Sequence, residues 1–308
     1  MEPTPLLVIA GPTGVGKTAA AVALARRLPM EVIGADSRQV YRGLDAATGK
    51  PTAAERRAVA HHLLDVVDPD DRYTAARFRT DALAAIAAVR QRGRLPVIVG
   101  GTGLYIRALL RGLDPAPPAD PAFRRELAGV AAAEGRAALH ARLHRESPEM
   151  ARRLHPNDAV RVVRALERLR AGGAPTQHRW GDAATGFDVV YVGLTRPRAA
   201  LFERLRTRAA AMVAAGLLDE VRGLLARGYS SALPALQGIG YREFARVAQG
   251  TLGAEEALSL MQRDTVRYAK RQATWFAREP QIEWLDAIDE ETVAAAIEKK
   301  VTMRGLCE

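Results

Sequence analysis

A glycine-rich segment near the N-terminus has the residues needed to bind phosphate. Residues 11–18 read G-P-T-G-V-G-K-T, which satisfies the pattern G-x-x-x-x-G-K-[ST] in full. In such a loop the glycines let backbone N–H groups curl around a phosphate, and the start of the next helix adds a positive dipole. Lys17 would neutralise a terminal phosphate, and the Thr18 hydroxyl would hold a Mg²⁺ ion. The pattern therefore predicts a phosphate-binding loop that works with magnesium.

Asp36 could add acid–base chemistry to this loop. It follows an apolar run at residues 32–35, while a third apolar run, at 96–99, is followed by Gly100, Gly101 and Thr102. A carboxylate at the end of a neighbouring strand would face the mouth of the loop and could act as a base. Asp is also a common helix-cap and turn residue, so the local sequence supports both interpretations.

The elements that must position these residues alternate between short apolar runs and longer helical patterns. Residues 6–10, 32–35 and 96–99 read as buried strands, and helices are expected at 17–28 and 74–91. This alternation is typical of βαβ units and a parallel sheet. Ligands bind beyond the carboxyl ends of such strands, so the three strand ends should lie along one edge. We predict an α/β fold with a P-loop NTPase-like parallel sheet core flanked by helices and a mostly helical insertion domain.

A change of composition marks the predicted insertion. The segment D-P-A-P-P at 114–118 reads as a linker, and helix-start signals follow at Asp120, Ser147 and the pair 157–158. A G-G pair at 172–173 would end the last of these helices. Residues 187–194 return to strand character, and further helices are expected at 197–215, 216–227 and 254–278. We predict an α/β core over 1–118 and 183–308 and a helical insertion domain over 119–182.

The charge distribution favours a polyanionic partner. Forty-five Lys and Arg residues against 35 Asp and Glu give a net charge of +10. Residues 279–308 carry 3 basic and 8 acidic side chains, which leaves +15 on residues 1–278. Arg161, Arg164 and Arg168 share one helical face, which could contact phosphates or be solvated. Residues 267–276 mix basic and aromatic side chains that could contact nucleic acid or pack in the core.

Other features limit the class of protein. Cys307 is the only cysteine, so the chain can form no internal disulfide and no cysteine-based zinc site, which fits a cytoplasmic location. The six histidines show no convincing metal-binding pattern. No apolar run approaches the ~18 residues needed to span a bilayer, so no membrane association is expected. In the absence of an obvious coiled coil, we expect a monomer.

Six sequence blocks occur in the order found in one enzyme family. They are residues 11–18, A-D-S-R-Q-V-Y at 35–41, G-G-T-G-L-Y at 100–105, H-P-N-D at 155–158, G-I-G-Y-R-E at 238–243 and R-Y-A-K-R-Q at 267–272. Together they closely resemble the bacterial tRNA dimethylallyltransferase family. That resemblance implies transfer of a dimethylallyl group from dimethylallyl diphosphate to N6 of the adenosine immediately 3′ of the anticodon in tRNA, with Mg²⁺ as cofactor.

The resemblance also implies roles for individual residues. The diphosphate would bind to Gly11, Pro12, Thr13, Gly14, Val15, Gly16, Lys17, Thr18 and Arg208. Asp36 would be the general base, Thr102 would lie near the reacting centre, and Thr18 would be the protein ligand of Mg²⁺. The tRNA would contact Asp36, Ser37, Arg38, Gln39, Thr102, Arg124, Arg161 and Arg164.

Three alternatives share the phosphate loop. A small-molecule kinase would turn over a nucleotide and would have no need for the excess of positive charge. A prenyltransferase that modifies free adenine nucleotides would not need an insertion with 12 basic and 8 acidic residues. A non-catalytic RNA-binding NTPase would not depend on Asp36. The sequence also leaves open whether ATP binds in the same loop.

Overall fold

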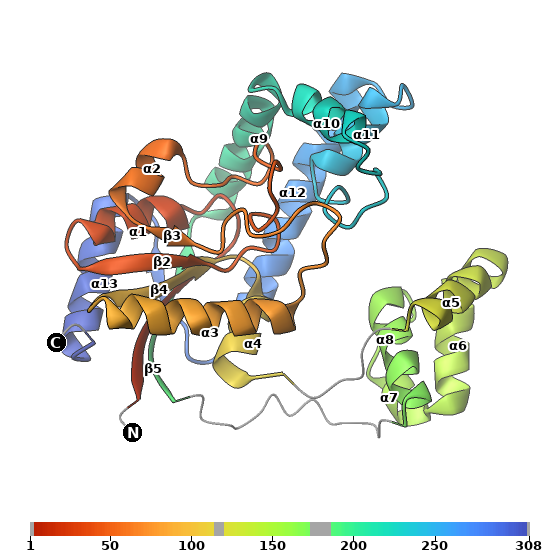
Figure 1. Cartoon of the computed structure of the whole chain (residues 1–308), viewed down its shortest axis with the longest axis horizontal. Coiled ribbons are helices and arrows are strands. Elements are labelled where there is room, and N and C mark those ends of the chain that lie inside the picture. The colour runs from red at the N-terminus through yellow and green to blue at the C-terminus, as the bar shows by residue number, and fades with distance from the viewer. Residues whose placement is uncertain (1–2, 114–119, 173–185, 307–308) are drawn as a thin grey trace. The chain divides into compact units, whose positions relative to one another are not determined.

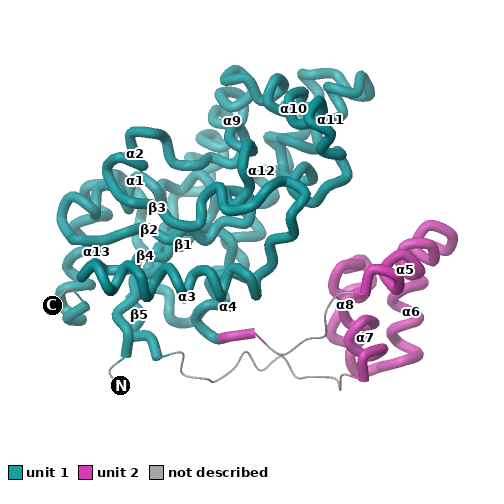
Figure 2. The backbone as a smooth tube through the Cα atoms, in the orientation of Figure 1, with its two compact units in different colours: residues 1–111, 184–308 teal, residues 112–183 magenta. Residues whose placement is uncertain are grey.

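The computed structural model describes residues 3–113, 120–172 and 186–306, which form two compact units. Unit 1 comprises Met1–Arg111 and Ala184–Glu308, and unit 2 comprises Gly112–Ala183 (Figure 2). The predicted linker at 114–118, Gly173 and Cys307 lie outside the described residues. Within the described parts, no helix combines the length and the apolar character that crossing a membrane requires.

Unit 1 is built on a six-stranded sheet in which every pair of neighbouring strands is parallel. The strand order is β3-β2-β4-β1-β5-β6. In chain order the strands are β1 (Thr4–Ala10), β2 (Met30–Gly34), β3 (His61–His62), β4 (Leu95–Gly100), β5 (Phe187–Thr195) and β6 (Glu283–Asp286). The central strands are continuous apolar runs because helices cover both faces of the sheet. The predicted α/β fold is confirmed at this level.

Alternate residues of β1 contribute to two separate cores. Leu6 and Val8 belong to one core with residues of α3 (Ala75–Gln91), α4 (Gly103–Arg111) and the helices that follow β5. Leu7 and Ile9 belong to the other, with residues of α1 (Lys17–Ala25) and α13 (Glu290–Met303). Figure 1 shows α3 and α13 at different faces of the sheet. The sheet is therefore held between two helical layers, which fixes the ends of its strands.

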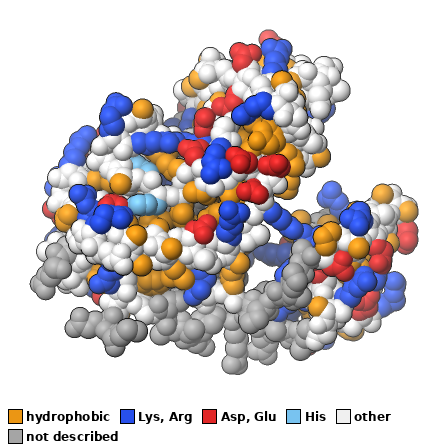
Figure 3. Space-filling model, viewed as in Figure 1, with side chains coloured by type: hydrophobic (Ala, Val, Ile, Leu, Met, Phe, Trp, Pro, Cys, Tyr) orange, Lys and Arg blue, Asp and Glu red, His pale blue; other side chains and the backbone are white. Residues whose placement is uncertain are grey.

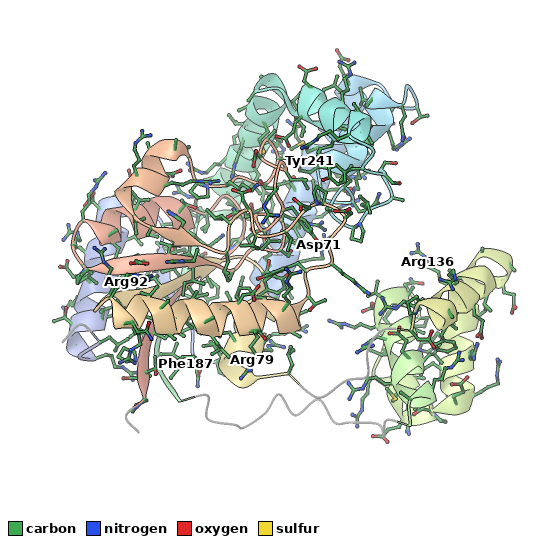
Figure 4. The ribbon with its side chains drawn as sticks, in the orientation of Figure 1. Asp71, Arg79, Arg92, Arg136, Phe187 and Tyr241 are labelled. Carbon is green, nitrogen blue, oxygen red and sulfur yellow. The ribbon has the colours of Figure 1, made fainter. Side chains whose placement is uncertain are left out.

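Four helices after β5 form a helical part of unit 1. They are α9 (Arg198–Ala214), α10 (Leu217–Ala226), α11 (Tyr241–Ala248) and α12 (Ala254–Phe276), and they pack against one another (Figure 1). Tyr241, labelled in Figure 4, is buried at the start of α11, and its hydroxyl donates a hydrogen bond to Glu220 in α10 (2.5 Å). A short helix, α2 (Ala53–Ala58), lies between β2 and β3 and begins with a capping box at Thr52.

Ion pairs fix strand β2 near its N-terminal end. Glu31 is buried, and it accepts two hydrogen bonds from Arg92, which follows α3 and lies beside β2 in Figure 4 (2.9 and 2.7 Å). Hydrogen bonds from Arg92 lower the pKa of Glu31 to about 2 despite its burial, and His62 contributes in the same direction. The carboxylate therefore stays ionised and holds α3 against the sheet.

Unit 2 is a small bundle with a core of its own. It contains α5 (Pro121–Glu134), α6 (Arg136–Glu146), α7 (Pro148–Arg152) and α8 (Ala159–Arg170). Asp120, Ser147 and Asp158 cap three of these helices by accepting hydrogen bonds from backbone N–H groups, as their sequence signals predict. Phe123, Leu127 and other apolar side chains fill the interior. Gly172 has a φ of +73°, typical of a residue that follows the end of a helix.

Candidate active site

The carboxyl ends of three neighbouring strands form one edge of the site. Strand β1 leads into the loop of residues 11–16, β2 leads to Asp36, and β4 leads to Gly101 and Thr102. Because β2, β4 and β1 are adjacent and parallel, these segments lie side by side. A cavity of about 300 Å³ is lined by residues of all three. The sequence-based expectation that they share one edge is confirmed.

The phosphate loop presents some of its residues to this cavity and uses others as support. Those that line the cavity are Thr13, Gly14, Gly16, Lys17 and Thr18. Val15 is buried in the core, while Gly11 and Pro12 are not among the lining residues, and their carbonyl oxygens accept hydrogen bonds from Lys17 Nζ (3.0 and 2.9 Å). The expected diphosphate-binding residues therefore divide into lining and supporting groups.

Positive charge is concentrated in this cavity. Burial lowers the pKa of Lys17 to about 8, Asp36 opposes this shift, and the positive charge of Arg208 adds to it. Arg208 comes from α9 and lines the same cavity, where burial and the nearby charge of Arg204 lower its pKa. Two cations that line one cavity together with a single aspartate favour the binding of a polyanion.

Asp36 is half-buried and is held in a turn. Its Oδ1 atom accepts a hydrogen bond from the backbone N–H of Arg38 (2.8 Å), which is the local turn geometry that the residue type favours. The carboxylate also lines the cavity with Lys17 and Arg208. Both interpretations of Asp36 from the sequence therefore describe part of its surroundings, since a turn holds the carboxylate at the phosphate loop.

Thr102 connects the end of β4 to the segment that carries Asp36. Its Oγ1 atom accepts a hydrogen bond from the backbone N–H of Ser37 (3.0 Å), and its own N–H donates to the carbonyl of Ala35 (3.1 Å). Tyr268 of α12 interacts with the Thr102 side chain, and burial raises the pKa of this tyrosine to about 12. Thr102 is thus adjacent to Asp36 in space although 66 positions separate them in the sequence.

A second cavity adjoins the first. It shares Thr13, Asp36, Thr48 and Arg208 with the phosphate-loop cavity. Its other lining residues are largely apolar or cationic and include Ser37, Arg38, Leu205, Ala209, Met212, Ile239, Arg242, Met261, Tyr268 and Arg271. Asp36 therefore stands where the phosphate-loop cavity meets a second cavity, which is the placement that a base between two substrates needs.

Two of the residues expected to contact tRNA also have structural contacts inside the protein. Arg38 donates hydrogen bonds to the carbonyl oxygens of Pro234 and Ala235 (2.7 and 3.4 Å). Gln39 Nε2 donates to the carbonyls of Thr48 and Gly49 (3.3 and 3.1 Å), and its side chain lines the phosphate-loop cavity. These bonds fix the 36–39 segment against two other loops.

The residues in the phosphate-loop cavity suit a magnesium ion. Mg²⁺ prefers oxygen ligands, keeps several waters, and is usually held by one or two protein groups together with substrate phosphates. Thr18 and Asp36 supply oxygen atoms to the cavity. Among residues 3–113, 120–172 and 186–306 there is no group of three or more His, Cys, Asp or Glu residues that could hold a metal by itself. The donor set therefore fits an ion shared between Thr18 and a bound diphosphate.

Several lining residues have a role that their sequence surroundings do not predict, although Gln272 ends the block R-Y-A-K-R-Q. Thr48, Gly49 and Lys50 reach the cavity from the loop before α2, and Gln272 reaches it from α12. Their contribution depends on tertiary contacts, which the sequence does not display. The glycines that flank Thr102 are the one signal in the sequence for these tertiary contacts, because a glycine at a strand end often marks a close approach by another segment.

The three arginines expected to contact tRNA in unit 2 have different surroundings. Arg124 forms a two-point ion pair with the buried Glu167 (2.6 and 2.9 Å), and Arg164 contacts the same carboxylate (3.0 Å). Arg161 is 65% exposed and pairs with Asp158 at 3.5 Å. Arg168, on the same face of α8, is buried. The basic face expected from the spacing is thus exposed at Arg161 but partly used for internal packing.

The mixed basic and aromatic segment in α12 contributes mainly to packing at its aromatic positions. Phe276 is buried, and Trp275 lies under Arg107, whose guanidinium carbon is 4.2 Å from the ring centroid.

Basic side chains are spread over the visible surface of each unit, with acidic ones among them (Figure 3). Charge alone therefore does not delimit a nucleic-acid surface on this face.

Comparison with known sequences shows a consistent family. The IPP transferase family profile matches residues 39–279. A tRNA dimethylallyltransferase of Anaeromyxobacter dehalogenans is 49% identical over 298 residues, which cover 96% of this chain and 99% of the relative. A tRNA dimethylallyltransferase of Syntrophobacter fumaroxidans is 46% identical over 298 residues, which cover 95% of this chain and 86% of the relative.

Solved structures agree with the sequence comparisons. The full-length tRNA isopentenylpyrophosphate transferase from Bacillus halodurans matches with a TM-score of 0.73 and 39% identity, covering 97% of this chain and 96% of that one. A eukaryotic dimethylallyltransferase acting on tRNA matches with a TM-score of 0.77 and 28% identity, covering 98% of this chain and 79% of that one. Each of these similarities therefore extends over nearly the whole chain.

Proposed function

Since the chain belongs to the tRNA dimethylallyltransferase family and is an enzyme of that class, we propose that it transfers a dimethylallyl group from dimethylallyl diphosphate to N6 of the adenosine 3′-adjacent to the anticodon of tRNA. The observation that carries the mechanism is the position of Asp36 in both cavities, beside Lys17 and Arg208. Asp36 is the general base, and the phosphate loop with Mg²⁺ stabilises the leaving diphosphate.

The phosphate-loop cavity binds the donor. Cleavage of the allylic C–O bond leaves negative charge on the diphosphate, and this charge is neutralised by Lys17, Arg208 and the N–H groups of the loop. Thr18 would hold the Mg²⁺ ion, which when bound lowers the cost of that charge in the same way. Fixed positive groups of this kind stabilise the leaving group more than they stabilise the intact donor.

The second cavity receives the target base. The N6 amine is a weak nucleophile because its lone pair is delocalised into the ring. As the new N–C bond forms and the C–O bond breaks, the amine gives one proton to the Asp36 carboxylate. A well-placed base of this kind accelerates a reaction by roughly 10²–10⁴-fold. Thr102 accepts a hydrogen bond from the N–H of Ser37, and through this bond it would hold the backbone beside Asp36 near the reacting centre.

The target adenine must leave the stack of the anticodon loop to reach such a site. Enzymes that modify a base commonly extrude it into a pocket, and single-stranded loops are the usual targets. Ser37, Arg38 and Gln39 would then contact the base and its neighbours. Unit 2 would bind the anticodon stem through phosphate contacts, with Arg161 as its exposed basic residue and Arg124 and Arg164 as further candidates.

An acceptor assay tests the proposed function. The protein is incubated with Mg²⁺, labelled dimethylallyl diphosphate, ATP and either bulk tRNA or AMP. Label in tRNA alone supports the proposal. Label in AMP would identify a free-nucleotide prenyltransferase, and ATP consumption without label transfer would identify a kinase or an NTPase.

Substitution of Asp36 tests the base. Asp36→Asn should lower the single-turnover rate at least ~10²-fold while tRNA affinity stays within about threefold, because the amide cannot accept the proton. Asp70→Asn, at an exposed position on the β3–α3 connection, is the matched control. An Asp36→Asn rate equal to that of the control would remove Asp36 from the base role.

A further inference from the structure

The side chain of Gln272 joins the phosphate loop to the loop that follows β4. It is buried, and its Oε1 atom accepts a hydrogen bond from the backbone N–H of Thr13 (2.9 Å). Its Nε2 atom donates to the carbonyl oxygen of Gly101 (2.9 Å). The acceptor end of the amide meets a donor and the donor end meets an acceptor, so the two partners fix the orientation of the amide.

The packing leaves little freedom for this amide. A Cβ atom placed on Gly101 would lie 2.4 Å from Gln272 Nε2, and one on Gly103 would lie 2.1 Å from Trp275 Nε1. Residues 268, 272 and 275 are spaced by four and three along α12, so they share one face of the helix. The glycines around Thr102 therefore allow one face of α12 to touch the loop directly.

From Gly101 the connection continues to the reacting centre. Thr102 accepts a hydrogen bond from the N–H of Ser37, and Asp36 is the preceding residue. Gln272 thus links the segment that would hold the diphosphate to the segment that would hold the base, and it lines the phosphate-loop cavity itself.

We propose that Gln272 is a positioning residue for the transfer reaction: its amide sets the distance between the phosphate loop and the pair Asp36–Thr102. This inference rests on the proposed function. A displacement of about 1 Å between reacting groups costs about 10²-fold in rate. Loss of both hydrogen bonds should therefore slow the chemical step more than it weakens the binding of either substrate.

The test compares two glutamines of the same helix. Gln272→Met keeps the volume and removes both hydrogen bonds, and Gln262→Met is the control, because Gln262 also donates to a backbone carbonyl, that of Arg206 (3.2 Å), but lines neither cavity. We expect Gln272→Met to lower the single-turnover rate at saturating substrates by about 10- to 100-fold, with the Kd for inorganic diphosphate changed by about threefold or less. Gln262→Met should retain the wild-type rate.

A second variant separates positioning from a general loss of structure. In Gln272→Glu, a protonated carboxyl group can accept from Thr13 and donate to Gly101, whereas the ionised form cannot donate. The rate of this variant relative to wild type should therefore rise as the pH falls from 8.5 to 6, while the ratio for Gln272→Met stays constant.

Three results would overturn the inference. One is a Gln272→Met rate within about twofold of the Gln262→Met rate. Another is a rate loss fully explained by a smaller folded fraction, measured by titration of active sites. The third is a Gln272→Glu rate that stays low relative to wild type at every pH.

Asp36→Asn is measured in parallel. If it keeps full activity, the proposed function fails, whereas a slow Asp36→Asn with an active Gln272→Met contradicts only the role of Gln272.

Discussion

Lys17 and Asp36 lie in one cavity, where the carboxylate affects the protonation of the lysine. Burial alone would favour a neutral lysine, while the nearby carboxylate favours the charged form, and the result is a pKa of about 8 for Lys17. A lysine that titrates close to neutral pH can lose its charge under ordinary assay conditions. Arg208 keeps its charge in the same cavity, because a guanidinium stays protonated even when its pKa is lowered.

Donor binding should therefore depend on pH through Lys17. Its amine is charged below about pH 8 and neutral above it, so the affinity for dimethylallyl diphosphate should fall as the pH rises from 7 to 9. Bound diphosphate favours the charged amine and reduces the effect, so we expect the Kd to rise by about 3- to 10-fold. Calorimetric titration measures this change.

Lys17→Arg provides the control for that titration. Its guanidinium stays charged over the whole range, so its Kd, although weaker at every pH, should change by less than about twofold between pH 7 and 9. A rise in the Lys17→Arg Kd as steep as that of wild type would assign the pH dependence to another group.

At the scale of elements, the loop before α2 supports the side chain of Arg208. Gly49 has a φ of +62°, and a Cβ atom placed on it would lie 1.7 Å from Arg208 Nη2. Gln39 holds the carbonyl of Gly49, and Lys50 donates hydrogen bonds to Asp45, Asp65 and the carbonyl of Tyr41. Because the guanidinium packs closely against the backbone at Gly49, it has a defined position in the phosphate-loop cavity.

Gly49→Ala should displace Arg208 and weaken donor binding by about 10-fold, roughly the value of one charge-assisted hydrogen bond. Gly250→Ala is the matched control, because Gly250 has a φ of +72° and no described atom lies within 4 Å of its Cβ position. Both variants should lose about 1 kcal/mol of stability from left-handed strain. Donor Kd and thermal unfolding are measured for each, and equal donor Kd values in the two variants would contradict the role of Gly49.

The strands of the centre of the sheet can be predicted from sequence, whereas its edges cannot. Residues 6–10, 96–99 and 187–194 are apolar runs because they are covered on both faces. Strand β3 has two residues, and β6 reads Glu-Trp-Leu-Asp with mostly exposed side chains, so neither has an apolar pattern. Helix α1 ends at Ala25, three residues before the expected end, since the residues that follow form a turn before β2.

The same distinction holds within the site. The phosphate loop and Asp36 follow from local sequence because their geometry depends on a strand, a turn and a helix that are adjacent in the chain. Gln272 and Gly49 could not be identified in this way, because Gln272 contacts Thr13 across 259 positions and Gly49 lies under an arginine from another helix. The roles assigned to the arginines of unit 2 stay predictions.

Helix α8 depends on a buried carboxylate. Burial would raise the pKa of Glu167, but hydrogen bonds from Arg124 and Arg164 outweigh it and lower the pKa to about 2. This folded-state pKa lies below the unfolded value of about 4.3, so the stabilisation is fully present above about pH 5 and is lost as the pH falls towards 2.

Glu167→Gln should therefore destabilise unit 2 by about 2 kcal/mol at pH 7, since Arg124 and Arg164 lose the negative charge of the carboxylate that they share. Hydrogen exchange is the appropriate measurement: amides of residues 121–170 should lose protection, and those of α3 should keep it. Glu146→Gln, which affects a carboxylate that is 40% exposed, is the control and should change little. Unchanged protection in Glu167→Gln would show that the ion pairs contribute nothing to the fold of unit 2.

At the scale of the whole molecule, the excess positive charge has a physical consequence for binding. Residues 1–278 carry a net charge of +15. Contacts between basic side chains and phosphates release counterions, so the affinity for tRNA should fall steeply as salt increases. A weak salt dependence would contradict the proposal that the enzyme holds the stem of the tRNA through its backbone.

Arg161 allows this proposal to be tested at one residue. Its side chain is 65% exposed, whereas Arg124 and Arg164 are bound to Glu167, so their replacement would disturb the fold as well as any phosphate contact. If Arg161 contacts one phosphate, Arg161→Gln should reduce the slope of log Kd against log salt concentration by about 0.9 and weaken binding several-fold at low salt. Arg26→Gln is the matched control, since Arg26 is 69% exposed and pairs with a single glutamate, Glu291, of α13. Equal slopes for the two variants would exclude Arg161 from the interface, whereas a reduced slope for Arg161→Gln alone would place the RNA backbone on unit 2.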